Sequence, residues 1–190
     1  MNSFFSENEL LKLGLKKYGK NVKISRNAQF YGKENISIGD NVRIDDFCIL
    51  SGNIIIGSNI HIAAGTFLYG GDAGIEMKDF SCLSSRCVVY ALTDDYSGEY
   101  MANSVIPEKY KNVTGGKVEI GRHALIGTGC TILPNVKIGE GASVGAMSLI
   151  RNDIEEFTIN VGIPCKKIKN RSKKLLELEK EYIKEDNEEK

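Results

Sequence analysis

An aliphatic residue returns at every sixth position through most of this chain. The period is clearest between residues 120 and 150, at Ile120, Ile126, Ile132, Ile138, Val144 and Ile150. A second position, four residues later in each hexad, holds small or apolar residues: Ala124, Cys130, Val136, Ala142, Ser148 and Ile154. A helix repeats its faces every 3.6 residues and a continuous strand every second residue, so neither explains a strict period of six. The pattern predicts a parallel β-helix, in which each short strand is buried against the coils on either side.

The same phase occurs earlier in the chain and sets the expected domain limits. It occupies Ile38, Ile44, Leu50, Ile56, Ile62 and Leu68, is broken at residues 70–74, and resumes at Met77, Leu83 and Val89. We expect a small bulge at the break. The predicted organisation is an all-β solenoid over residues 20–168, with an N-terminal helical cap over 1–19 and a C-terminal helix and charged tail over 169–190. Both helical segments are expected to cap or brace the ends of the solenoid, where strand edges are otherwise unpaired.

The composition excludes several classes of partner. Lysine plus arginine equals aspartate plus glutamate at 25 each, so no net field recruits nucleic acid or an anionic membrane. The sequence has neither a transmembrane run nor the apolar core of a signal peptide, and we expect a cytoplasmic protein. Cys48, Cys87 and Cys130 fall on inward positions and are interpreted as core residues in a reducing compartment.

One long interruption of the period runs over residues 91–117. A loop of this length inside a regular solenoid is uncommon unless it has a function. Its acidic and aromatic residues, Asp94, Asp95, Tyr96, Glu99 and Tyr100 among them, suit a hydroxyl-rich ligand. We therefore predict the site here. A protruding loop that only braces a neighbouring subunit is the alternative.

Three segments carry a resemblance to a known family. They are residues 94–100, the run Ile126-Gly127-Thr128-Gly129, and residues 161–166, together with the hexads. The chain resembles the left-handed β-helix, hexapeptide-repeat acyltransferases, and among these the galactoside-type and surface-polysaccharide sugar acetyltransferases. The resemblance implies a left-handed coil, a homotrimer with active sites between subunits, acetyl-CoA as donor without a metal, and a sugar or nucleotide-sugar as acceptor.

The resemblance also implies where the donor lies. In the relatives the pantetheine arm of CoA follows the last coils, and the matching residues here are Thr128, Gly129, Gly145 and Ala146. The CoA phosphates need cations, and Lys166 and Lys169 in the basic stretch after the last coil are the expected contacts. A solvated basic turn without a ligand is the alternative.

The general base is the point of departure from the relatives. Galactoside-type enzymes place a histidine just before the long loop, and Asp94 fills that position here. Aspartate is a weaker base than histidine at neutral pH, although a charged neighbour such as Asp95 can strengthen it. His61 and His123 are the other candidates. A further possibility is that no strong base is needed, because the acceptor is a sugar amine.

Acceptor contacts and competing functions complete the expectations. Asp72, in the bulge, matches an acidic residue that binds acceptor hydroxyls in the galactoside enzymes, and Asp95 and Tyr96 are the expected loop contacts. The predicted function is acetyl transfer to a sugar hydroxyl or amine in bacterial surface-polysaccharide biosynthesis. The alternatives are an N-acetyltransferase for a nucleotide-linked amino-dideoxy sugar and a non-enzymatic scaffold. A zinc site of the γ-carbonic-anhydrase kind needs three histidines, whereas the chain has two.

Overall fold

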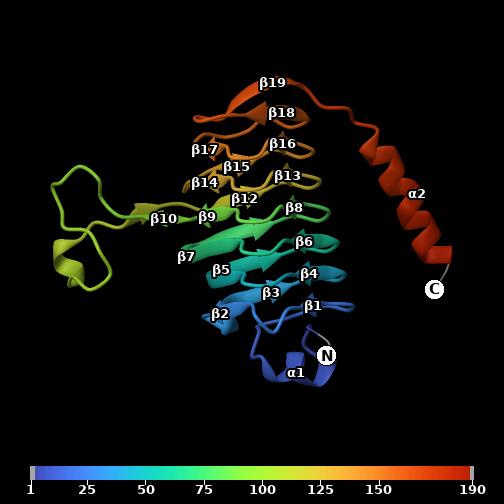
Figure 1. Cartoon of the computed structure of the whole chain (residues 1–190), viewed down its shortest axis with the longest axis horizontal. Coiled ribbons are helices and arrows are strands. Elements are labelled where there is room, and N and C mark those ends of the chain that lie inside the picture. The colour runs from blue at the N-terminus through green and yellow to red at the C-terminus, as the bar shows by residue number, and fades with distance from the viewer. Residues whose placement is uncertain (1–2, 189–190) are drawn as a thin grey trace.

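The structure is a computed structural model that describes residues 3–188, and its strands stack into a left-handed parallel β-helix (Figure 1). The period predicted from the sequence is the period of the core. The aliphatic residues of the clearest stretch are 0–3% exposed: Ile120, Ile126, Ile132, Ile138, Val144 and Ile150. Removing one such side chain from water stabilises the fold by about 1.5–3 kcal/mol, so the column of residues defines the solenoid axis. The predicted fold class is confirmed.

Three faces run along the solenoid and are named A, B and C in chain order. Face A consists of β1 (Lys23–Ile24), β4 (Val42–Ile44), β6 (Ile60–Ile62), β8 (Cys82–Leu83), β13 (Leu125–Ile126), β16 (Ser143–Val144) and β18 (Thr158–Val161). Face B consists of β2 (Gln29–Tyr31), the first halves of β5 (Ile49–Ile56) and β7 (Phe67–Met77), β9 (Val88–Tyr90), β14 (Thr131–Ile132) and β17 (Leu149–Ile150). Face C consists of β3 (Ile36–Ile38), the second halves of β5 and β7, β12 (Val118–Ile120) and β15 (Lys137–Ile138). Coils 1 to 6 begin at β1, β4, β6, β8, β13 and β16.

The corner between faces A and B, here called corner AB, is a regular column. Its turns place one residue of each coil in the left-handed region: Phe47, Gly65, Arg86, Gly129 and Met147, from coil 2 to coil 6. Main-chain bonds stack these turns, for example from the Gly65 N–H to the Asp46 carbonyl at 2.9 Å and from the Met147 N–H to the Thr128 carbonyl at 2.8 Å. The side chains of this corner therefore form a row parallel to the solenoid axis.

The corner between faces B and C, corner BC, is where the coil is irregular. In coil 3 the predicted bulge at residues 70–74 lies inside β7, and the register with β5 shifts there. Gly52 and Gly71 stack closely, and a Cβ on Gly52 would lie 2.5 Å from the Gly71 nitrogen. In coil 4 the long loop leaves this corner on a stem of β10 (Leu92–Thr93) and β11 (Thr114–Gly115), and projects away from the solenoid (Figure 1).

The N-terminal segment forms less helix than expected. Helix α1 spans only Glu7–Lys12, with its first turn closed by a capping box between Ser6 and Glu9. The residues on either side instead bond to the first coil: Phe4 bridges Ser25, and Lys17 bridges Ser37. Leu10 is 4% exposed and joins the core. This segment does cover the N-terminal end of the solenoid (Figure 1).

The C-terminal helix does not cover the opposite end, and that expectation is wrong. The last coil is instead covered by β19 (Lys166–Asn170), which pairs antiparallel with β18. Helix α2 (Leu175–Glu188) then folds back beside the solenoid (Figure 1). It is anchored by Glu179, which accepts hydrogen bonds from Arg122 and His123, and by Tyr182, which packs edge-on against Phe80. No helix among the described residues is long and apolar enough to cross a membrane.

Candidate active site

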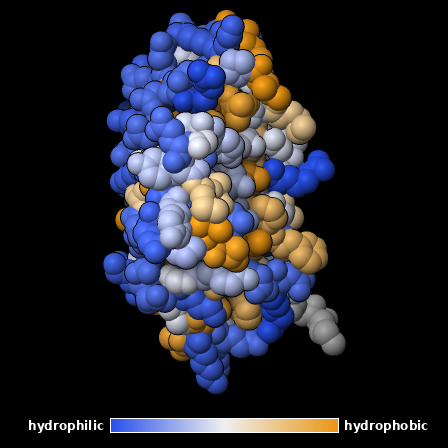
Figure 2. Space-filling view, turned by 90° about the vertical axis from the view of Figure 1, so that its left-hand side faces the viewer, coloured by the Kyte–Doolittle hydropathy of each residue, from blue (hydrophilic) through white to orange (hydrophobic). Residues whose placement is uncertain are grey.

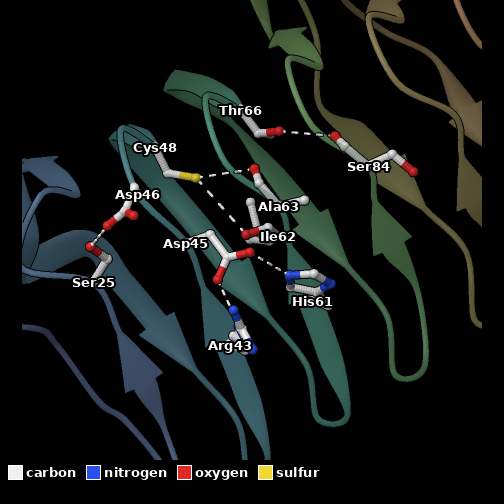
Figure 3. A network of polar contacts seen from close by, with 10 residues as sticks. All are labelled: Ser25, Arg43, Asp45, Asp46, Cys48, His61, Ile62, Ala63, Thr66 and Ser84. Carbon is white, nitrogen blue, oxygen red and sulfur yellow. Dashed lines mark hydrogen bonds and ion pairs between the residues drawn. The ribbon is translucent and has the colours of Figure 1, made fainter. Parts of the chain in front are cut away.

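Side-chain hydrogen bonds hold corner AB rigid from coil to coil. Ser25 donates to the Asp46 carboxylate, the Cys48 thiol donates to the Ala63 carbonyl at 3.3 Å, and Thr66 donates to the Ser84 carbonyl at 3.1 Å (Figure 3). Cys48, Cys87 and Cys130 are 0% exposed, as the sequence predicted, and burial raises the pKa of Cys87 to about 12. These thiols are therefore structural donors at neutral pH.

The predicted CoA residues lie together at the upper part of this corner. Thr128 and Gly129 turn coil 5, and Gly145 and Ala146 turn coil 6. The Thr128 hydroxyl donates to the Ser85 carbonyl at 2.6 Å and lies 3.1 Å from the Ser85 hydroxyl. Ala146 is exposed, with no side chain beyond Cβ to obstruct an approaching ligand. These four residues, here called the donor track after their predicted role, form stacked turns with small side chains, at which an extended arm can lie close to the main chain.

The predicted phosphate contacts lie beyond the last coil, on β19. Lys166 and Lys169 are exposed and form no ion pair with any residue that the structure describes, whereas Lys167 bonds to Glu155 at 2.7 Å. Arg171 is not part of this exposed group, because it donates to the carbonyls of His123 and Gly141. Lys166 pairs with Val161 at the corner AB end of β18, whereas Lys169 pairs with Ile159, nearer the other end of that strand.

A cleft opens at corner BC, at the base of the long loop. Its volume is about 380 Å³, and its lining comes from the loop stem and from coils 4 and 5: Tyr90, Leu92, Thr93, Asp94, Tyr96, Val113, Leu133 and Pro134. Tyr90 stacks on Tyr69 at 5.2 Å between ring centroids, which fixes one wall. Asp94 is exposed and supplies the one carboxylate in this lining. The loop prediction thus led to a cleft of ligand size.

The other predicted acceptor contacts differ in how they are placed. Tyr96 is 92% exposed at the rim of the cleft. Asp95 turns into its own loop, where its carboxylate accepts from the N–H and hydroxyl of Ser97, at 2.9 and 2.7 Å, and these bonds lower its pKa. Asp72 is exposed in the bulge one coil below the stem, and the Leu92 side chain lies over neighbouring Gly71. Asp72 is therefore close to the stem without lining the cleft.

His61 lies outside this cleft, on face A. It projects from β6, and its Nε2 is 2.8 Å from Asp45 Oδ2, while Arg43 donates to the other oxygen of Asp45 at 2.6 Å (Figure 3). Burial opposes the charge of Asp45, but the bonds from His61 and Arg43 outweigh it and lower the pKa of Asp45. The histidine is oriented by the Asp45 carboxylate and does not line the cleft that contains Asp94.

His123 also lies outside the cleft, and it is covered. Its side chain is 12% exposed beneath α2, its ring stacks on Phe80 at 5.0 Å, and its Nε2 is 2.7 Å from Glu179 Oε2. Burial lowers the pKa of His123, and the Arg122 and Arg171 cations add to this effect. A neutral ring that donates from Nε2 to Glu179 accounts for this geometry, so His123 anchors α2 in the described structure.

Most of the candidate residues thus lie at two corners of one chain, with Thr128 and Ala146 at corner AB and Asp94 and Tyr96 at corner BC. His61 and His123 belong to neither group. Ser84, which sequence reasoning did not single out, lies with the corner AB residues, where it follows β8 on coil 4 directly below Gly127 of coil 5. The hexad pattern could have identified Ser84, because it comes directly after the inward Leu83, just as Gly127 comes directly after the inward Ile126. Among the described residues, no group of three or more His, Cys, Asp or Glu side chains is placed to hold a metal.

The hexapeptide coils and the cleft at the base of the long loop are the features to compare with known proteins, and the comparisons identify a family of acyl-transferring enzymes. The family model described as bacterial transferase hexapeptide (six repeats) matches residues 35–70 and 117–152. A dTDP-4-amino-4,6-dideoxy-D-glucose acyltransferase from Escherichia coli is 49% identical over 180 residues, covering 93% of each chain. The chain therefore belongs to the hexapeptide-repeat transferase family.

Solved structures of a second relative closely match this chain in both sequence and fold. AntD, an N-acyltransferase from Bacillus cereus, was solved in complex with dTDP and 3-hydroxybutyryl-CoA, with 54% identity, a TM-score of 0.96, and coverage of 98% of this chain and all of that one. It was also solved as its S84C mutant with dTDP-4-amino-4,6-dideoxyglucose and coenzyme A, and as its D94N mutant with dTDP and coenzyme A. The close relatives are sugar acyltransferases that use acyl-CoA, which is the class predicted from the sequence.

Proposed function

We propose that this chain is an N-acyltransferase that moves an acyl group from a CoA thioester to the amine of a nucleotide-linked amino-dideoxy sugar. The observation that carries the proposal is the chemistry of the corner BC cleft, whose lining contains Asp94 and no histidine. A sugar hydroxyl must lose its proton as it attacks, which calls for a base tuned to neutral pH. An amine attacks as the free base and loses a proton afterwards, a task that a carboxylate can perform.

The reaction follows from the groups at the two corners. The amine nitrogen attacks the thioester carbonyl carbon, the C–N bond forms, and the C–S bond breaks as CoA leaves with the bonding pair. The nitrogen releases a proton to Asp94, and the departing thiolate takes up a proton to give the free thiol. Main-chain N–H groups of the corner AB track, next to Ala146, are suited to stabilise the oxyanion that develops on the carbonyl oxygen.

The relatives support the same acceptor and the same two residues. The relative from Escherichia coli is a dTDP-4-amino-4,6-dideoxy-D-glucose acyltransferase, and the S84C mutant of AntD was crystallised with dTDP-4-amino-4,6-dideoxyglucose. AntD was also solved with substitutions at its residues 94 and 84, and this chain carries Asp94 and Ser84 at the same two numbers. We assign Asp94 as the proton acceptor and the Ser84 hydroxyl as a contact to the reacting sugar.

The proposed assembly is a homotrimer in which the loop of one subunit faces corner AB of the next. The support is the separation of the two groups of residues, because Asp94 and the Thr128–Ala146 track occupy different corners of one narrow solenoid. A closed ring of three copies brings one corner of each subunit against the other corner of its neighbour. We place the enzyme in the cytoplasm, where CoA thioesters are available, and in surface-polysaccharide biosynthesis.

The direct test is a comparison of two acceptors that differ at one atom. The enzyme is given dTDP-4-amino-4,6-dideoxyglucose or dTDP-6-deoxyglucose, with acetyl-CoA or 3-hydroxybutyryl-CoA as donor, and thiol release is followed. We expect kcat/KM for the amine to exceed that for the hydroxyl by roughly 10³ or more, because the hydroxyl must lose its proton as it attacks and the cleft lining contains no histidine to act as base. Preferential acylation of the hydroxyl sugar, or of simple glycosides, would overturn the proposal.

A further inference from the structure

A second hollow lies at the lower part of corner AB, two coils below the donor track. Its volume is about 400 Å³, and we call it the Phe47 pocket after the residue at its mouth. Its lining comes from coils 1, 2 and 3: Asn27, Gln29, Phe47, Cys48, Ile49 and Phe67. None of these residues belongs to the corner BC cleft. Figure 2, which looks onto the side from which the long loop projects, shows apolar side chains gathered among hydrophilic ones on this side of the solenoid.

The walls of the Phe47 pocket are aromatic. Phe47 is 67% exposed, and its backbone has φ of 60°, an unusual conformation for a phenylalanine. Phe67 is half-buried and stands beside Ile49 in the paired strands β7 and β5. An exposed ring held out from a rigid corner, with a second ring nearby, provides a surface on which a flat heterocycle can stack.

The floor of the pocket offers amide groups. Gln29 is exposed next to Ile49 in the β2–β5 register, and its side chain makes no hydrogen bond to the residues that the structure describes. Asn27 donates weakly from its side chain to Asp46 at 3.3 Å and keeps its side-chain oxygen available. An amide carries both a donor and an acceptor, which matches the alternating acceptor–donor–acceptor edge of a pyrimidine imide.

A free cation stands two coils above Phe47 in the same column. Gly65 separates Phe47 from Arg86 in the corner AB row, and the Arg86 side chain leans over it, with Cγ 3.5 Å from where a Gly65 Cβ would be. Arg86 is exposed and forms no ion pair with the described residues. Coils are about 4.8 Å apart, so roughly 10 Å separates the levels of Phe47 and Arg86, a distance that a ribose can bridge.

We propose that the Phe47 pocket binds the pyrimidine base of the nucleotide-linked acceptor, and that Arg86 binds its diphosphate. This inference rests on the proposed function, because it names the part of the protein that would recognise the nucleotide of that acceptor. The sugar beyond the diphosphate then reaches Ser84, on the same coil as Arg86. The donor arm approaches from the other direction along Thr128 and Ala146, so acceptor and donor meet at coil 4.

Binding of nucleotide fragments separates the two contacts. Affinities of the wild-type trimer for dTDP, thymidine and inorganic pyrophosphate are measured by titration calorimetry, without acyl-CoA. Phe47→Ala should weaken the binding of dTDP and of thymidine by about tenfold or more, which is the effect of losing one stacking contact to a base. Arg86→Gln should weaken the binding of dTDP and pyrophosphate but leave the affinity for thymidine unchanged. Met147→Ala, in the same column at its opposite end, is the matched control and should leave the dTDP affinity unchanged.

The outcomes distinguish this inference from the proposed function. If the amino sugar is acylated but Phe47→Ala and Arg86→Gln both bind dTDP as the wild type does, the pocket assignment is wrong and the proposed function stands. If dTDP binds with the expected pattern but no amino sugar is acylated, the pocket stands and the proposed function fails. Sedimentation of each variant is part of the test: a Phe47→Ala chain that is no longer trimeric identifies the pocket as a subunit interface and overturns the inference.

Discussion

The solenoid interior and the loop at corner BC obey different constraints. Inside, Leu83 is 0% exposed and can only pack against the coils above and below it. In the loop, Tyr96 is 92% exposed, and few of the side chains that surround it are fixed by packing. The interior therefore specifies the fold and its rigidity, while the interruption supplies groups that are free to meet a ligand. Chemistry in this protein is expected where the period is broken or where outward residues line up from coil to coil.

The largest effect on stability is expected from the interior. Leu83→Ala removes a fully buried side chain from the central coil and should lower the free energy of unfolding by about 2–5 kcal/mol, because a close-packed solenoid cannot collapse around the cavity. Denaturant unfolding measures this change. Leu125→Ala, on the neighbouring strand but 41% exposed, is the control and should change stability by less than about 0.5 kcal/mol. Equal losses in both variants would contradict the inward–outward distinction.

A substitution at Asp94 in the loop should lower activity and leave stability unchanged. Asp94→Asn is expected to keep the melting temperature and the acyl-CoA affinity, and to lower kcat by roughly 10² or more, the scale of losing a general base. Glu99→Gln, another exposed carboxylate of the same loop, is the matched control and should retain kcat. Steady-state kinetics decides the matter: near-wild-type turnover in Asp94→Asn would mean that proton removal is performed by another group.

Helix α2 offers an intermediate case, since it is attached to the solenoid from outside. Glu179→Gln removes the carboxylate that accepts from Arg122 and His123 and should cost about 1–3 kcal/mol, because two partly buried donors lose a charged acceptor. Faster hydrogen exchange in α2, with kcat unchanged, is the expected signature. A fall in kcat without any change in exchange would instead indicate that the His123 cluster takes part in the reaction.

Substitutions at the end of the donor track should change only the KM for acyl-CoA. Lys166→Ala and Lys169→Ala are each expected to raise KM for acyl-CoA by about tenfold and to leave kcat unchanged, because a remote phosphate contact stabilises ground state and transition state equally. Lys167→Ala is the control, since Lys167 is occupied by Glu155. Identical behaviour of all three lysines would argue for a general electrostatic effect in place of defined contacts.

The smallest effect is expected at Asp95. Its carboxylate accepts from Ser97, and an asparagine oxygen can accept the same bonds, so Asp95→Asn should change kcat/KM by no more than a few fold. Hydrogen bonds from Ser97 lower the pKa of Asp95 in the folded protein. The ionised carboxylate therefore stabilises the turn at pH values above the unfolded-state pKa of about 3.9, and this stabilisation is lost as the pH falls through the lower folded-state pKa. Loss of this acid dependence in the variant, followed by loop fluorescence, checks the assignment. A hundredfold loss of activity would show that Asp95 contacts the substrate directly.

The sequence predicted the parts of this molecule that the repeat dictates. The period located the core residues, the bulge at residues 70–74 and the loop, because inward packing leaves one register for each coil. It did not predict that α2 lies beside coil 4, since a helix with an apolar stripe can pack on any exposed surface. Nor did it reveal the row of Phe47, Gly65 and Arg86. Insertions make the sequence spacing between aligned outward residues irregular, so only the folded register brings them together.

The central claim is that each active site combines corner BC of one subunit with corner AB of another, and subunit mixing tests it most directly. Two inactive chains are co-expressed with different tags and purified as mixed trimers: Asp94→Asn, and Ala146→Trp, in which an exposed small residue is enlarged to block the donor track. If the sites are shared, each mixed trimer has one site of three in which an intact Asp94 meets an intact donor track, and activity should return to roughly one third of the wild-type value. Mixed trimers as inactive as either parent would contradict the claim, because Asp94 and the track would then act within a single subunit.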